Sequence, residues 1–170
     1  MNIFLLSIIS YLVLALQSPF MAELGLNTYA PDLSIGLLLA ATSRLNPNRL
    51  LVFSLILGTL VDGFIPLSPL GLHMERLVIL AYTARTLLDT VSIQTTGEQV
   101  SYGIGLCLIS DFILFVLLAL FDKSFTEYGL IFRQMIPHAL VTGLSIPVVT
   151  WIVKVFWNRF VRRKDGIFYS

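Results

Sequence analysis

The chain has 170 residues, of which 56% are hydrophobic and only 12% are charged, and its mean hydropathy is +0.87. Soluble domains carry about one quarter charged residues, so this composition excludes an ordinary soluble protein and indicates a polytopic membrane protein. The formal net charge of +1 gives no sign of a nucleic-acid partner, and we expect none. At about 20 residues per span, the chain has room for five to six membrane helices in one domain over residues 1–170.

The apolar segments predict an all-α integral membrane protein, a six-helix transmembrane bundle. Residues 1–22 lack the positively charged start of a secretory signal peptide, so we expect an uncleaved first helix. The second segment, residues 31–43, would cover only about 20 Å of a hydrocarbon core about 30 Å thick. It either extends back through residues 24–29 with a break at Pro31, or forms a half-length helix packed among the others. The expected spans are residues 2–20, 31–43, 50–65, 70–88, 100–121 and 130–156.

The basic residues predict the orientation of these spans. The connections after the first and third spans carry no Lys or Arg and that after the fifth span carries Lys123, whereas the connection after the second span, the end of the fourth span and the C-terminal tail carry several. Because cytoplasmic segments are enriched in Lys and Arg, we expect both termini in the cytoplasm. Five spans would place the termini on opposite sides and remove this asymmetry. The residues concerned are Arg44, Arg49, Arg85, Lys154, Arg159, Arg162, Arg163 and Lys164.

Four ionisable residues, Asp62, His73, Glu75 and Arg76, surround the connection between the third and fourth spans. Asp62 lies near the end of the third span, and His73 and Arg76 share a face at the start of the fourth. A charge at membrane depth is costly unless it has a partner. We therefore expect Asp62 to pair with Arg76 or His73. The pair would be either a clamp that fixes the helical hairpin or a site for a ligand or partner helix.

Two further ionisable residues lie deeper in the predicted spans. Asp111 is near the middle of the fifth span, and His138 follows Pro137 in the sixth. A proline bends a helix, so we expect Asp111 and His138 to meet. Such a pair would serve either as a proton or ion relay or as a buried hydrogen bond between helices. Cys107 in the same apolar run is interpreted as a small packing residue.

Two pairs of small residues four positions apart favour close helix packing. Gly36 and Ala40 form one pair, and Ser101 and Gly105 the other. They serve either packing within the chain or contact with a partner helix. The chain has no sequence motif typical of zinc, nucleotide or serine-nucleophile sites. We therefore expect no catalytic residues, no metal site, no cofactor and no enzymatic activity.

Three short segments resemble the family of the rod shape-determining protein MreD. They are Ala-Pro-Asp-Leu at 30–33, Gly-Thr-Leu-Val-Asp at 58–62, and Ser-Pro-Leu-Gly-Leu-His at 68–73, and Tyr82 matches a tyrosine frequent in that family. The chain departs from the family pattern at Met74-Glu75-Arg76, Asp111 and His138. The candidate structural or partner-binding residues are Pro31, Asp32, Gly58, Asp62, Pro69, Gly71, His73, Arg76, Asp111 and His138.

The resemblance implies a multi-pass protein of the bacterial inner membrane, with a fold similar to that of the S components of ECF vitamin transporters. It implies a non-catalytic scaffold of the cell-elongation complex that lies in the lipid bilayer and binds MreC. Through MreC it would be linked to the transpeptidase PBP2, to RodA and to MreB, and so to lateral peptidoglycan synthesis and cell shape. The alternative is an S-component-like subunit that binds a small molecule such as a vitamin. That alternative predicts a polar pocket near Asp62, His73, Glu75 and Arg76.

Overall fold

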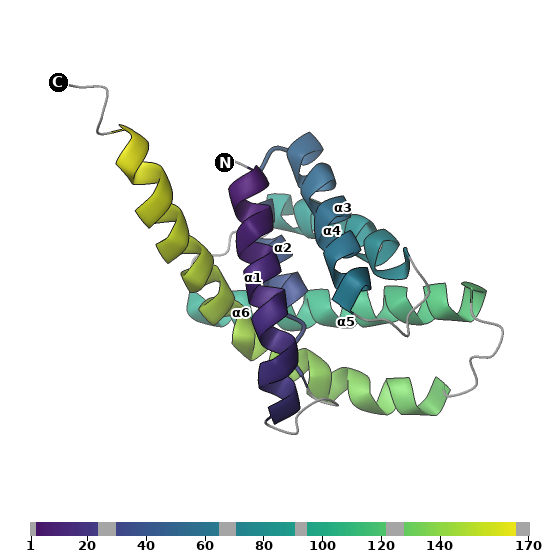
Figure 1. Ribbon diagram of the computed structural model, residues 1–170. Coiled ribbons are helices and arrows are strands. Elements are labelled where there is room, and N and C mark those ends of the chain that lie inside the picture. Colours follow the sequence, from purple (N-terminus) through teal and green to yellow (C-terminus); the bar gives the residue numbers. More distant parts are fainter. Residues whose placement is uncertain (1–2, 24–29, 65–70, 91–94, 122–127, 166–170) are drawn as a thin grey trace.

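The computed structural model describes residues 3–23, 30–64, 71–90, 95–121 and 128–165, and within these ranges all regular structure is helical (Figure 1). The prediction of an all-α protein with six helices is confirmed. The sixth helix continues past the predicted end at residue 156. The helices are α1 (Ile3–Glu23), α2 (Leu33–Thr42), α3 (Pro47–Phe64), α4 (Leu72–Thr90), α5 (Thr96–Phe121) and α6 (Tyr128–Asp165).

Three of the described helices are long and apolar enough to cross a membrane: α3, α5 and the part of α6 from Phe132 to Phe156. These three helices support a multi-pass membrane protein. That α1, α2 and α4 also cross the bilayer, and that both termini face the cytoplasm, stay predictions.

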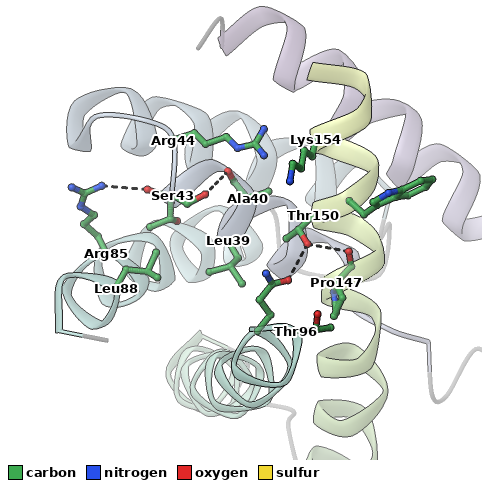
Figure 2. Close-up of a pocket in the computed structure, with 13 residues that line it drawn as sticks. Leu39, Ala40, Ser43, Arg44, Arg85, Leu88, Thr96, Pro147, Thr150 and Lys154 are labelled. Atoms are coloured by element: carbon green, nitrogen blue, oxygen red, sulfur yellow. Dashed lines mark hydrogen bonds between the residues drawn. The ribbon is translucent and has the colours of Figure 1, made fainter. Parts of the chain in front are cut away.

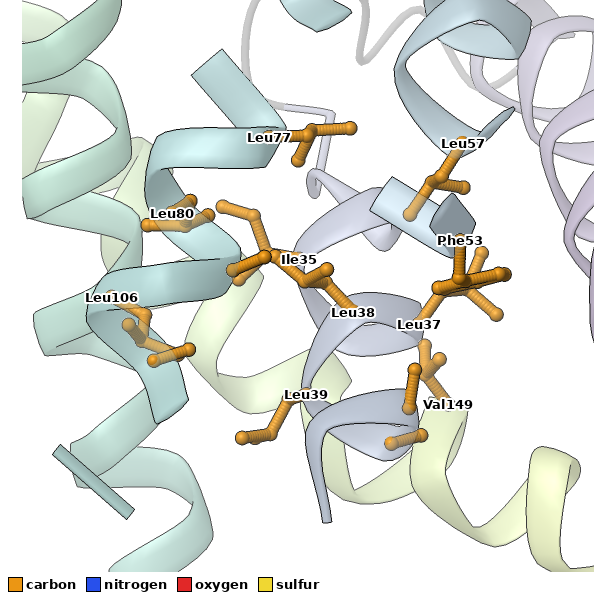
Figure 3. Packing of buried hydrophobic residues seen from close by; sticks show 14 of the residues in the cluster. Ile35, Leu37, Leu38, Leu39, Phe53, Leu57, Leu77, Leu80, Leu106 and Val149 are labelled. Carbon is orange, nitrogen blue, oxygen red and sulfur yellow. The ribbon is translucent and has the colours of Figure 1, made fainter. Parts of the chain in front are cut away.

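The short helix α2 lies at the centre of the bundle. It has ten residues, and every residue from Ser34 to Thr42 is buried. It contacts α1, α3, α4, α5 and α6. Figure 3 shows leucines and isoleucine of α2 surrounded by side chains from the neighbouring helices. These buried residues agree with a helix packed among the others, whereas residues 24–29, over which the other alternative extends the segment, lie outside the described ranges.

Helices α3 and α4 approach each other closely at Gly58. A Cβ atom added there would lie 2.3 Å from the Met74 Cα and 2.9 Å from the Met74 backbone nitrogen. Backbone atoms cannot move aside as the end of a flexible side chain can, so the absence of a side chain at Gly58 permits this packing. The connection between the two helices, including Pro69, lies outside the described residues.

Glycines also set the distance between α5 and α6, but not at the predicted pair. Ser101 is exposed, and a Cβ on Gly105 would meet nothing within 4 Å. Instead, a Cβ on Gly103 would lie 2.1 Å from Ile146 Cδ1, and one on Gly143 would lie 2.4 Å from Ile104 Cγ1. The α5–α6 contact therefore uses one small residue from each helix.

The predicted pair on α2 has a role within the chain. A Cβ on Gly36 would lie 3.0 Å from the Cβ of Val149 in α6, and Ala40 is buried. Packing within the chain is therefore confirmed for Gly36. Helix α6, which contains Pro137 and Pro147, bends between its first half along α5 and its second half (Figure 1).

We predict that Gly58→Ala destabilises the protein by about 1–3 kcal/mol, because the new methyl group overlaps the backbone of α4. The control is Gly63→Ala on the same helix, where a Cβ would meet nothing within 4 Å. That change should leave stability equal or slightly higher, since alanine favours helix over glycine. Unfolding in mixed detergent micelles measures both variants. Equal stability of the two would contradict the close approach at Gly58.

Candidate functional site

Asp32 connects three helices at the start of α2. As the residue before the first helical turn, it accepts a hydrogen bond from the Ser34 backbone N–H at 3.0 Å and another from the Ser34 hydroxyl. Its second carboxylate oxygen lies 2.8 Å from Nη2 of Arg76 on α4. Its backbone N–H donates to Thr142 Oγ1 on α6 at 3.0 Å. One residue therefore joins the start of α2 to α4 and α6.

The preceding residue extends this connection to α1. The side-chain amide of Gln17 donates to the carbonyl of Pro31. The Arg76 side chain is only 4% exposed, and that of Asp32 is 16% exposed. A buried ion pair of this kind specifies how helices fit together, and removing one partner is costly because the other is left uncompensated. The candidates Pro31, Asp32 and Arg76 are thus parts of one buried polar cluster.

Asp62 has a different role from the one predicted. Its carboxylate accepts hydrogen bonds from three backbone N–H groups at the start of α4: those of Gly71 at 3.1 Å, His73 at 3.0 Å and Met74 at 3.3 Å. The first N–H groups of a helix have no partner within the helix, and a negative charge there is favourable. A residue of α3 therefore supplies the cap of α4.

The prediction that Asp62 pairs with the side chain of Arg76 or His73 is wrong. Arg76 pairs with Asp32 instead, and Asp62 contacts His73 only through its backbone N–H. The imidazole of His73 is buried, and its Nδ1 makes no hydrogen bond within the described residues. Gly71 adopts φ 94°, a conformation that favours glycine, directly before α4 begins. Asp62 does clamp the α3–α4 hairpin, but it does so through the backbone.

The predicted meeting of Asp111 and His138 is confirmed. His138 Nδ1 lies 3.0 Å from an Asp111 carboxylate oxygen, and Cys107 Sγ lies 3.6 Å from the same nitrogen. Cys107 Sγ is also 3.9 Å from that carboxylate oxygen. From the sequence, Cys107 was expected to be a packing residue. Its spacing of four from Asp111, which places both on one face of α5, is the signal that connects them.

The geometry of this second cluster limits its chemistry. A cysteine–histidine–aspartate nucleophile needs the thiol and the carboxylate on different ring nitrogens, whereas here both face Nδ1. The three ligand atoms lie within 4.8 Å of one another and are of types that a divalent cation such as Zn²⁺ accepts. As hydrogen-bonding groups, the same three side chains hold α5 against α6.

A cavity of about 680 Å³ lies near the C-terminal end of α4 (Figure 2). Three cationic side chains line it: Arg44 in the connection after α2, Arg85 on α4 and Lys154 on α6. Arg85 Nη1 donates to the carbonyl of Thr42 at 3.2 Å. Burial lowers the pKa of the Arg44 guanidinium, although arginine stays charged at neutral pH. From the sequence, these residues predicted only which side of the membrane their segments face. That they line one cavity depends on how three distant segments pack.

No protein-family model matches the chain, and no significant match was found among curated proteins or among solved structures. The resemblance to MreD therefore stays a prediction that rests on the short segments around Pro31, Gly58 and Gly71.

We predict that Asp62→Ala destabilises the protein by about 0.5–2 kcal/mol, the usual cost of losing a helix cap. Three N–H groups at the start of α4 lose their acceptor. The control is Glu75→Ala, which removes an exposed carboxylate from the first turn of the same helix. Unfolding in detergent should show a clearly smaller loss for Glu75→Ala, and an equal or larger one would argue against the cap.

We predict that Asp32→Asn and Arg76→Gln are strongly coupled. Each single change leaves a mostly buried charge without its partner and should cost about 3–5 kcal/mol, whereas the double variant should lose less than the sum. Arg133→Gln, which removes an exposed cation from α6, serves as the control and should have little effect. Free energies of unfolding for the four variants measure the coupling. Additive losses would show that the pair does not contribute as a unit.

Proposed function

We propose that the protein is a non-catalytic membrane scaffold of the bacterial cell-elongation complex. It binds MreC and supports lateral peptidoglycan synthesis and cell shape, with indirect links to PBP2, RodA and MreB. It lies in the inner membrane, with six spans and both termini in the cytoplasm. The resemblance of the three short segments to the MreD family is the origin of this proposal.

The proposal is supported by the contacts of the three segments that resemble the MreD family, because their described residues connect helices to one another. Asp32 joins α2 to α4 and α6, Gly58 permits the close approach of α3 and α4, and Asp62 caps α4. These residues set the shape of the bundle rather than present reactive groups in a cavity. A protein whose distinctive residues maintain a shape is suited to recognition by a partner helix in the membrane.

Tyr82 also matches the MreD family, but unlike Asp32, Gly58 and Asp62 it is not assigned to a contact between helices. It lies on α4 with 73% of its surface exposed. In a membrane an exposed aromatic side chain contacts either lipid or a partner helix. We therefore place the MreC contact on the face of α4 that carries Tyr82.

The alternative of an S-component-like binding subunit has less support. Asp62, His73 and Arg76, which would line its pocket, are buried, and Asp62 and Arg76 are bonded to backbone and to Asp32, respectively. A cavity beside Glu75 measures about 250 Å³ and is lined otherwise by Leu55, Met74, Val78 and Ile79. This lining is mostly apolar.

Co-purification tests the proposal. The full chain is expressed with the MreC protein of the same organism and isolated in mild detergent, and we expect both proteins in a fixed ratio. Tyr82→Ala should reduce the recovery of MreC about tenfold, the effect of losing an aromatic anchor at an interface. Phe112→Ala, which removes an exposed aromatic side chain from α5, should not.

Two outcomes would contradict the proposal. In the first, the folded chain is purified without MreC, and in the second, it is purified with a bound vitamin or with the energising module of a transporter. Equal recovery with Tyr82→Ala and Phe112→Ala would leave the scaffold proposal intact but remove the assignment to the Tyr82 face of α4.

A further inference from the structure

We propose that the cavity lined by Arg44, Arg85 and Lys154 is a binding site for a phosphate-bearing anion, either the headgroup of an anionic lipid or free phosphate. The cavity measures about 680 Å³, within the range of about 300–1,000 Å³ typical of small-ligand sites. This inference does not depend on the scaffold proposal, since none of the motif residues lines the cavity.

Among the described residues that line the cavity, all the charged ones are cationic. Its three cationic residues come from three separate parts of the chain, and no Asp or Glu is among the described residues that line it. Figure 2 shows the Arg44 and Lys154 side chains turned toward the same space, with Arg85 on the α4 side. Arg85 is already bonded to the Thr42 carbonyl. Arg44 and Lys154 are therefore the residues that would bind an anion, since Arg and Lys are typical ligands of phosphate.

The hydrogen-bonding state of these groups also favours an anion. Arg44 Nη1 is shielded from solvent yet has no hydrogen-bond partner within the described residues. An unsatisfied buried donor is costly, more so when it is charged. The Ser43 and Thr150 hydroxyls at the cavity wall already donate to backbone carbonyls. The donors that face the cavity are therefore those of Arg44 and Lys154, with the Thr96 hydroxyl beside them. A phosphate group, which accepts several hydrogen bonds at once, matches this set of donors.

The position of the cavity favours a lipid as the source of the phosphate. Lys154 lies shortly before the basic sequence at residues 159–164, and Arg44 follows the buried helix α2. This is the end of the apolar region, the depth at which lipid headgroups lie. The wall also includes Leu39, Leu88 and the exposed Trp151. Tryptophan is enriched at the membrane interface, and apolar side chains here suit the glycerol and upper acyl chains.

Native mass spectrometry of the full chain in detergent tests the proposal. The chain is titrated separately with dioleoylphosphatidylglycerol, with dioleoylphosphatidylcholine and with inorganic phosphate. We expect phosphatidylglycerol to bind about tenfold more tightly than the zwitterionic lipid, because only the latter carries a choline cation that the cationic side chains of the cavity repel. Binding and competition by inorganic phosphate would identify a soluble anion as the source, whereas binding of the lipid alone would identify the headgroup.

Variants connect this binding to the cavity. Arg44→Gln and Lys154→Gln should each weaken phosphatidylglycerol binding about tenfold. The matched control is Arg49→Gln, which removes an exposed cation at the same end of the bundle but outside the cavity, and it should leave binding unchanged. Equal binding of the two lipids, or equal weakening by Arg44→Gln and Arg49→Gln, would overturn the proposal, because surface charge alone would then explain the binding.

A fluorescence measurement that leaves the cavity residues unchanged tests the same proposal even where a cavity variant fails to fold. The chain has two tryptophans, so Trp157→Phe leaves Trp151 as the fluorescent residue at the cavity. Phosphatidylglycerol with brominated acyl chains should quench its fluorescence at lower concentration than brominated phosphatidylcholine. Identical quenching curves would also overturn the proposal.

Discussion

The carboxylate of Asp32 is the constraint on which the arrangement of the bundle depends. The residues of α2 from Ser34 to Thr42 are buried, so its first turn lies among other helices rather than in water. Backbone groups buried in this way must find their partners within the protein. Asp32 caps the helix, its charge is balanced by Arg76, and its N–H is satisfied by Thr142. Helices α4 and α6 are therefore held where these groups can reach α2.

The backbone N–H groups at the start of α4 also need acceptors, and Asp62 on α3 supplies them. Its carboxylate accepts hydrogen bonds from these N–H groups, whereas the Asp32 carboxylate also pairs with a cation. Gly58, one helical turn earlier on the same face, permits the close approach that brings this carboxylate to the end of α4. The Gly-x-x-x-Asp pattern is thus explained by packing and capping together.

Length and composition were sufficient to predict the all-helical bundle, because helix formation depends on the local runs of apolar residues. The Asp111–His138 contact was also predictable, since two polar groups deep in adjacent apolar segments need one another. The partner of Arg76 was not predictable from the sequence. Asp62 is nearer in sequence, whereas Asp32 is 44 residues away and reaches Arg76 only because α2 packs inside the bundle. The cavity at Arg44 likewise depends on tertiary packing, whereas the position of Cys107 beside Asp111 followed from their spacing on one helix face.

The two ends of α4 differ in how their charges are satisfied, and this difference indicates where the protein meets other molecules. At its start, the carboxylates of Asp62 and Asp32 have partners within the chain, although His73 Nδ1 and Arg76 Nε make no hydrogen bond within the described residues. Toward its other end, Arg44 and Lys154 face a cavity whose described wall includes no carboxylate, and Arg44 Nη1 has no acceptor within the described residues. Satisfied polar groups hold a shape, whereas an unsatisfied donor gains free energy when a ligand supplies the acceptor. Binding of an anion is therefore expected at the Arg44 end, and the capped end provides the rigid frame that positions it.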